Sequence, residues 1–159
     1  MYNYFKFENK LILNSSKKQY KKAVLLGEIA PIGQCYRKES LYKHVDFDAY
    51  ENMNIAIEDY PILVDMVMNT DFERINEPFC IYRSHDASYS HQKDLDKLVF
   101  QKQQMKTLFD YFFEKYDFPL DIKQKYLNSH YKTLLFYAGY FSNKMLGKEA
   151  YKNIESKSI

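Results

Sequence analysis

The stretch IAIEDYPILVDMVMNTDFERINEPFCIYRSHDASYS runs from Ile55 to Ser90 and decides how the rest of the chain is interpreted. Pro61 is tolerated in the first turn of a helix and disfavours helical geometry at the residue before it. The apolar residues that follow recur at helical spacing. A helix is therefore predicted from about Asp59–Pro61 to Asn69. Its predicted buried side consists of Ile62, Leu63, Met66 and Val67.

Three short segments read as strands. Phe72–Asn76 alternates polar and apolar residues, and Phe79–Tyr82 follows it after the Glu77–Pro78 break. Earlier in the chain, Ile29–Tyr36 reads as an edge or bulged strand because it contains a proline and a glycine. These strands predict some β structure in the first two thirds of the chain.

The remaining N-terminal elements are predicted as helical. Ser15 or Ser16 can cap a helix over Lys17–Leu26, and Gly27 suits the residue that ends it. Lys38–His44 predicts one or two helical turns, followed by a loop over Val45–Asn54. Residues 1–14 are aromatic and apolar and fit either a strand or a helix.

From Asp94 onward the pattern is helical throughout, with apolar residues at three- and four-residue spacings. Phe118–Pro119 ends a first helix, and a second is predicted over Asp121–Leu146, with a frayed polar end after it. The predicted fold is α/β and helix-rich overall. Residues 1–92 form one part, and residues 93–159 form a helical C-terminal extension.

Composition restricts the class of protein. The chain has 159 residues, a formal net charge of +2 and no apolar run long enough for a membrane span. So small a charge gives no reason to expect nucleic-acid binding. Cys35 and Cys80 lie in apolar stretches, and no secretory segment opens the sequence. Both are predicted to be free core thiols of a protein in a reducing compartment, the cytoplasm.

The acidic pair Glu58–Asp59 has two interpretations. A carboxylate at a helix N-terminus is stabilised by the free N–H groups there, so the pair can simply cap the helix. It can also supply a general base at a helix tip, because a carboxylate suits the removal of a proton from a sugar hydroxyl. The two interpretations do not exclude each other.

Tyr82-Arg83-Ser84-His85 also admits two interpretations. Arg83 can pair with a diphosphate and His85 can ligate a divalent metal, or both can belong to a polar turn at a strand end. The two Asp-x-Asp triplets, Asp46-Phe47-Asp48 and Asp94-Leu95-Asp96, do not follow a buried apolar strand. We therefore interpret both triplets as surface features and not as metal ligands.

In order, these features resemble the family 2 glycosyltransferases, which have a GT-A fold. The resemblance covers roughly residues 28–92. Its first two segments are Ile29-Ala30-Pro31 with Cys35-Tyr36-Arg37-Lys38-Glu39-Ser40-Leu41, and Asp46-Phe47-Asp48. The third comprises Glu58-Asp59-Tyr60, the apolar helix, Glu77-Pro78-Phe79 and Tyr82-Arg83-Ser84-His85.

The resemblance implies a partial GT-A fold. Residues 1–92 would be the acceptor-side half of such an enzyme. The nucleotide-binding half, with its Pro-Thr-Tyr-Asn-like loop and metal-binding Asp-x-Asp, has no counterpart in this sequence. We therefore expect a truncated or split enzyme of bacterial surface polysaccharide synthesis, inactive without the other half.

The resemblance also implies roles for individual residues. Asp59 would be the catalytic base of an inverting transfer from a nucleotide sugar to a glycan or lipid-linked acceptor. Glu58 and Tyr60 would contact the acceptor. Arg83 would bind the diphosphate, and His85 would help to hold a divalent metal, Mn or Mg, in the complete enzyme.

A second hypothesis is a non-enzymatic helical interaction module. The C-terminal extension is rich in Phe, Tyr and Lys at amphipathic spacing. Such a stripe is more often part of the core, but it can also dock on a membrane surface. The chain is therefore expected in the cytoplasm, with a peripheral place at the inner membrane face as the alternative. Donor sugar, acceptor, linkage and oligomeric state are not predicted.

Overall fold

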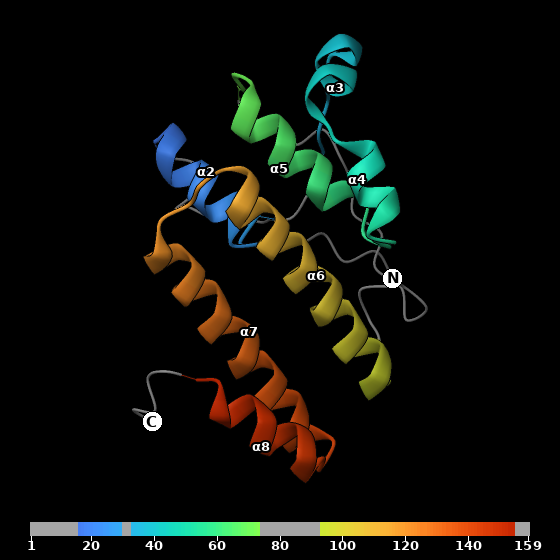
Figure 1. The fold of residues 1–159 in the computed structure, drawn as a ribbon, viewed down its shortest axis with the longest axis vertical. Helices are drawn as coiled ribbons and strands as arrows, with labels where there is room; N and C mark the ends of the chain where they lie inside the picture. The colour runs from blue at the N-terminus through green and yellow to red at the C-terminus, as the bar shows by residue number, and fades with distance from the viewer. Residues whose placement is uncertain (1–15, 30–32, 74–92, 155–159) are drawn as a thin grey trace, which may run out of the picture. The chain divides into compact units, whose positions relative to one another are not determined.

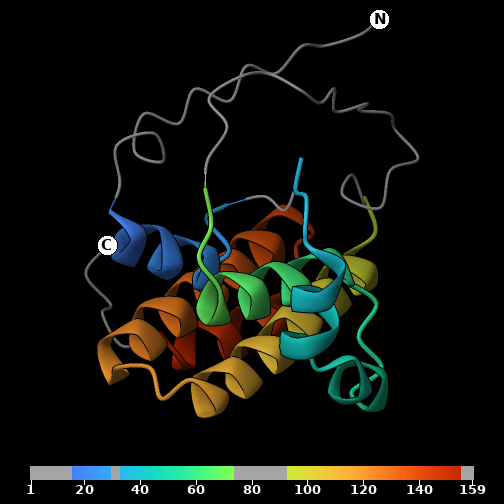
Figure 2. The same ribbon diagram turned by 90° about the horizontal axis from the view of Figure 1, so that it is seen from above.

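The computed structural model describes residues 16–29, 33–73 and 93–154. The chain forms two compact units, Met1–His91 and Gln92–Ile159, and each is described by itself. The described residues contain the helices α2 to α8 drawn in Figures 1 and 2. The division between the units falls beside the residue 92/93 boundary expected from the sequence.

The structure confirms a helix-rich chain, and it shows no strand within the ranges given above. In the predicted strand Ile29–Tyr36, the described residues 33–36 are irregular. Gly33 has a φ of 69°, which is incompatible with an extended strand at that residue. Phe72 and Glu73 are also irregular. The rest of Phe72–Asn76, all of Phe79–Tyr82 and residues 1–14 lie outside the described residues.

Helix α2 (Lys17–Leu25) begins and ends as its sequence predicts. The Ser16 side chain accepts from the backbone N–H of Gln19, and the Gln19 side chain accepts from the backbone N–H of Ser16. At the other end, Gly27 has a φ of 68°. The N–H groups of Gly27 and Glu28 donate to the carbonyls of Val24 and Ala23, both at 2.9 Å. This pair of hydrogen bonds closes the helix and requires left-handed backbone at Gly27.

Helix α5 (Asp59–Asn69) is the centre of the first unit and contacts both α2 and α3. It begins and ends as predicted from the sequence. Its buried residues cover more than one face of the helix, so α5 is an interior element and not a surface one. They are Tyr60, Pro61, Leu63, Val64, Asp65, Met66 and Val67.

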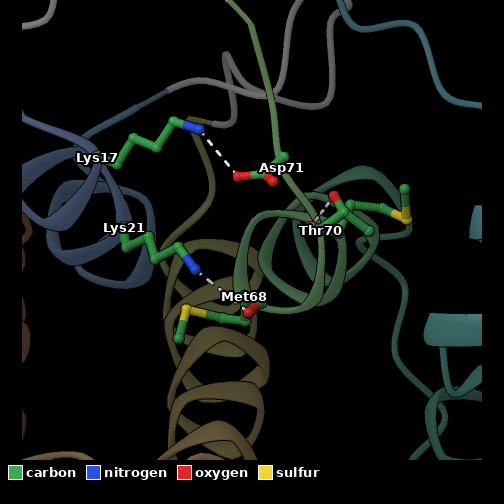
Figure 3. Close-up of polar contacts among 6 residues, drawn as sticks. Lys17, Lys21, Met68, Thr70 and Asp71 are labelled. Carbon is green, nitrogen blue, oxygen red and sulfur yellow. Dashed lines mark hydrogen bonds and ion pairs between the residues drawn. The ribbon is translucent and has the colours of Figure 1, made fainter.

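The C-terminal end of α5 is held to α2 by two lysines (Figure 3). Lys17 Nζ pairs with the Asp71 carboxylate at 2.9 Å, and Lys21 Nζ donates to the Met68 carbonyl at 3.3 Å. Carbonyls in the last turn of a helix lack intrahelical partners, and cations there also interact favourably with the helix dipole. The Thr70 hydroxyl donates to the Met66 carbonyl at 2.6 Å. These bonds set where α5 ends.

Two short helices follow α2. Helix α3 (Lys38–His44) matches the predicted helical turns. The loop predicted over Val45–Asn54 is wrong, because this segment contains helix α4 (Phe47–Asn52). The Asp46 side chain accepts from the backbone N–H of Ala49 at 3.1 Å and so caps α4. One of the two Asp-x-Asp triplets is therefore a helix start.

The described residues of the second unit, 93–154, form three helices. Helices α6 (Leu95–Lys115) and α7 (Leu120–Tyr140) run in opposite directions, and α8 (Lys144–Lys152) packs against α7 (Figure 1). The other Asp-x-Asp triplet opens α6, where the Asp94 side chain accepts from the Lys97 N–H at 3.0 Å. The core includes Phe109, whose ring stacks on that of Tyr126 with centroids 3.7 Å apart. This contact joins α6 to α7.

The single helix predicted over Asp121–Leu146 is wrong at its C-terminal end. The chain turns at Ser142, which has a φ of 55°, and Asn143 then caps α8 by accepting from the Leu146 N–H at 3.0 Å. The turn allows α8 to fold back on α7, so that Ala150 and Ile154 are buried. The first part of the end expected to fray, up to Lys152, is therefore helical, and residues 155–159 lie outside the described residues.

Candidate functional site

The acidic pair lies at the start of α5. Glu58 occupies the N-cap position, but its side chain makes no capping hydrogen bond, and Asp59 is the first helical residue. Both residues are exposed. The Asp59 Oδ1 atom accepts a hydrogen bond from the backbone N–H of Tyr60 at 2.8 Å. The carboxylate of Asp59 is thus both held at the helix start and open to solvent.

Tyr60 connects the start of α5 to the end of α2. Its ring is buried, and its hydroxyl donates to the backbone carbonyl of Leu25 at 2.6 Å. Burial raises the pKa of Tyr60 well above its ordinary value of 10.0. Tyr60 is predicted to contact the sugar acceptor. To do so, it would have to use atoms other than its hydroxyl, or the hydroxyl would have to give up its hydrogen bond to Leu25. What the structure shows directly is that Tyr60 fixes Asp59 relative to the end of α2.

A residue that sequence reasoning did not single out for chemistry lies near Asp59. Tyr36 is half-buried, and its hydroxyl donates to the side-chain oxygen of Gln34. Burial raises the pKa of Tyr36 to about 12, with smaller contributions from Tyr20 and from the Asp59 carboxylate. Tyr36 is therefore a neutral hydrogen-bonding group close enough to Asp59 to sense its charge. Only its place in the resemblance, between Cys35 and Arg37, drew attention to it beforehand.

The other predicted site residues are not placed. Arg83 and His85 lie outside the described residues, as does the Glu77–Pro78 turn, so their distances to Asp59 stay predictions. Within residues 16–29, 33–73 and 93–154, no group of three or more His, Cys, Asp or Glu side chains is arranged to hold a metal ion. The described part of the chain thus offers a candidate base but no metal centre of its own.

One cysteine prediction needs correction. Cys35 is a free thiol, as expected, but it is exposed and not in the core. It lies in the irregular segment after Gly33, where no paired strand covers its side chain. Cys80 lies outside the described residues.

A second surface of interest lies on α7. Phe136 is 67% exposed and Tyr140 is 76% exposed, and their rings lie 6.4 Å apart in a nearly parallel arrangement. A shallow hollow with a volume of about 520 Å³ runs beside them along the helix. Its lining residues are Lys125, Asn128, Ser129, Lys132, Thr133 and Phe136. This surface combines aromatic rings with cationic groups.

Comparison of the chain with protein-family models, with curated proteins and with solved structures gives no match. The described helices also include none with the length and apolar character needed to cross a bilayer. The function of the chain must therefore be argued from its own residues.

Proposed function

We propose that this chain is the acceptor-side half of a family 2-like glycosyltransferase of GT-A type. It would act in bacterial surface polysaccharide synthesis, moving a sugar from a nucleotide sugar to a glycan or lipid-linked acceptor. The observation that carries the proposal is the Asp59 carboxylate, exposed at the start of α5 and held by the Tyr60 N–H. A general base needs such a fixed orientation together with access to the substrate.

In the proposed reaction, Asp59 takes the proton of an acceptor hydroxyl as its oxygen attacks the anomeric carbon. The new glycosidic C–O bond forms, the bond from the anomeric carbon to the diphosphate breaks, and the configuration inverts. Arg83 would pair with the departing diphosphate. A divalent Mn or Mg ion would neutralise charge on the same group in the complete enzyme, and His85 is the ligand that we propose from this chain.

Three features of the structure support Asp59 in this role over a purely capping role. Glu58, at the N-cap position, makes no capping bond. Tyr60 ties the first turn of α5 to α2 through its hydroxyl, which limits movement of the neighbouring carboxylate. Tyr36 presents a hydroxyl in the same region that stays protonated, and it would donate to an oxygen of the sugar acceptor if its hydrogen bond to Gln34 were exchanged. Glu58, exposed beside Asp59, would contact the acceptor.

The proposal is tested with the chain alone and with a donor half. Because a nucleotide-binding half is proposed to be separate, calorimetric titration of this chain with nucleotide sugars and Mn²⁺ should show no tight binding. Adding a protein that supplies an Ile/Val strand, a Pro-Thr-Tyr-Asn-like loop and an Asp-x-Asp should produce transfer. Tight binding of a nucleotide sugar by this chain alone would contradict the proposal that the nucleotide-binding half is separate.

A second candidate function is a helical docking module, and one observation favours it. The aromatic residues of α7 are not all buried, because Phe136 and Tyr140 lie open to solvent. Single exposed apolar residues are common, but two exposed aromatic rings beside each other form an apolar patch of the kind that marks a contact surface. We therefore propose docking by the second unit as a function that can accompany or replace sugar transfer. A cytoplasmic location, peripheral at the inner membrane face, belongs to this proposal.

A further inference from the structure

The exposed side of α7 carries a continuous stripe of residues, which we call the α7 stripe: Lys125, Ser129, Lys132, Phe136 and Tyr140. At 3.6 residues per turn, these positions fall within about 80° of one another around the helix axis. They span about 22 Å along it. Four buried residues of α7, Tyr126, His130, Leu134 and Ala138, lie on another side of the helix, and a fifth, Ile122, shares the angle of Tyr140 but lies five turns before it. The α7 stripe is thus separate from the packing of the unit.

The stripe has an apolar end and a cationic end. Phe136 and Tyr140 lie one turn apart, and Met145 follows after the turn into α8 with 79% of its surface exposed. Lys132 lies one turn before Phe136, and Lys125 lies two turns before Lys132. Large apolar side chains are expensive to leave in water, so a cluster of them at the end of a helical hairpin indicates a contact surface.

The charge around the stripe is mostly positive, with the exposed carboxylates of Asp121, one turn before Lys125, and Glu149 as exceptions. No Asp or Glu occurs from Ile122 to Lys148, whereas this interval contains Lys123, Lys125, Lys132, Lys144 and Lys148. All of these lysines except Lys123 are exposed. Lys123 Nζ instead lies 4.4 Å from the centroid of the Phe113 ring. A surface on which exposed cations outnumber carboxylates is complementary to an anionic partner.

We propose that the α7 stripe docks the protein on the surface of an anionic lipid bilayer. Phe136 and Tyr140 would enter the boundary between headgroups and acyl chains, and Lys125 and Lys132 would lie at the level of the phosphates. Helices that lie in the membrane interface combine aromatic or apolar residues with lysines in this way. A second copy of the chain would bring cations of two stripes together, which disfavours self-association through this face. The inference deepens the second proposed function and does not depend on Asp59.

The test is co-sedimentation of the full chain with vesicles. Vesicles of phosphatidylcholine mixed with phosphatidylglycerol should bind the protein, and vesicles of phosphatidylcholine alone should bind it much less. Binding should weaken as salt is raised, because juxtamembrane lysines act within a Debye length of the surface. Equal binding to both kinds of vesicle, or no binding to either, would overturn the proposal.

Paired substitutions assign the binding to the stripe. Phe136→Ser with Tyr140→Ser, and separately Lys125→Glu with Lys132→Glu, should each reduce the partition coefficient by about tenfold or more. Matched controls lie on α6: Phe100→Ser removes an aromatic ring that is 53% exposed, and Lys97→Glu reverses an exposed charge. Both controls should bind within about twofold of the unmodified chain. Controls that lose as much binding as the stripe variants would overturn the assignment.

Sedimentation velocity without lipid tests the other occupant. We expect no dimer that forms through the stripe. A dimer of that kind would be recognised because the double variant Phe136→Ser with Tyr140→Ser abolishes it. Such a dimer would show that a second copy covers the stripe, and the proposal would fail. Asp59→Asn should leave vesicle binding unchanged, so loss of docking and loss of sugar transfer are separate results. Circular dichroism of each variant confirms that the helices are retained.

Discussion

The hydroxyl of Tyr50, on α4, donates a hydrogen bond to the carboxylate of Asp65, on α5, and both residues are buried. The backbone N–H of Asp46 donates to the same carboxylate oxygen at 3.1 Å. A charged group in the interior is tolerated only when donors surround it. Asp65 therefore fixes the position of α4 against the helix that carries the candidate base.

We expect Asp65→Ala to lower the free energy of unfolding by about 2–3 kcal/mol, because it leaves the buried Tyr50 hydroxyl and the part-buried Asp46 N–H without this acceptor and opens a cavity. Tyr50→Phe should cost about 1 kcal/mol, since the Asp46 bond remains. Urea unfolding followed by circular dichroism measures both. The control is Asp48→Ala, which removes an exposed carboxylate from α4, the short helix that carries Tyr50. An Asp65→Ala cost no larger than that of the control would contradict this role.

Two glycines form a matched pair for a backbone prediction. Gly27 has a φ of 68°, which strains any residue with a Cβ, so Gly27→Ala should destabilise the chain by about 1 kcal/mol. A Cβ at Gly139, within α7, would meet no atom within 4 Å. Gly139→Ala should therefore stabilise the chain by up to about 1 kcal/mol. Thermal melts of the two variants should shift in opposite directions, and a shift in the same direction would be evidence against this account.

His130 gives the second unit a dependence on pH. Its imidazole is buried between Tyr126 and Tyr131, and its Nδ1 has no hydrogen-bond partner among the described residues. Burial lowers the pKa of His130 from 6.5 to about 4, with further lowering by Lys102 and Lys106 and a small opposing effect of Asp110. The neutral imidazole is thus the form that the folded state accepts.

The sign of the pH effect follows from linkage. Since the folded-state pKa lies below the unfolded-state value, the unfolded chain binds the proton first as the pH falls. The contribution of His130 to the free energy of unfolding is complete above about pH 6.5 and decreases between about pH 6.5 and about pH 4. Below about pH 4 this contribution no longer changes. We expect a loss of about 3 kcal/mol across this window, the free energy that corresponds to a pKa lowered from 6.5 to about 4.

His130→Phe isolates this contribution, because a phenyl ring can occupy the same stack without titrating. Urea unfolding of both proteins at a series of pH values from 7 to 4 gives the difference in stability, which removes the titration of the carboxylates common to both. The difference should shift in favour of the Phe variant as the pH falls. A difference that is independent of pH would contradict the buried neutral state of His130.

Elements with local signals could be predicted from the sequence. Ser16 and Gly27 mark the ends of α2 through side-chain capping and a left-handed turn, and Pro61 places the first turn of α5. These signals act within a few residues, so tertiary packing does not alter them. The helical character of the C-terminal extension also followed from a periodicity that continues over many residues.

The missed features depend on contacts between distant residues. Helix α4 is short, and it is held by Asp65, which lies 19 residues after the Asp46 N–H that it accepts from. The turn between α7 and α8 contains neither proline nor glycine at its left-handed residue, Ser142, so apolar spacing continued across it. Asp65 interrupts an apolar run in the sequence. This isolated carboxylate was the one sequence signal of the contact that holds α4. The exposure of Phe136 and Tyr140 could not be read from spacing at all.

The proposed function requires Asp59 to act as a catalytic base and not only as a helix start. Asp59→Asn should keep the fold, since the residue is exposed and the amide oxygen can still accept from the Tyr60 N–H. The expected change in stability is within about 0.5 kcal/mol. Glu58→Gln, at the neighbouring exposed carboxylate, is the matched control and should affect KM for the acceptor more than kcat.

The most direct measurement is therefore kcat for sugar transfer by the complete enzyme, meaning this chain together with a nucleotide-binding half, with and without Asp59→Asn. Release of the nucleoside diphosphate in the presence of acceptor reports turnover. The Asn variant should lose about 10²- to 10⁴-fold in kcat while its melting temperature is unchanged. Turnover equal to that of the unmodified enzyme would contradict the assignment of Asp59 as the base.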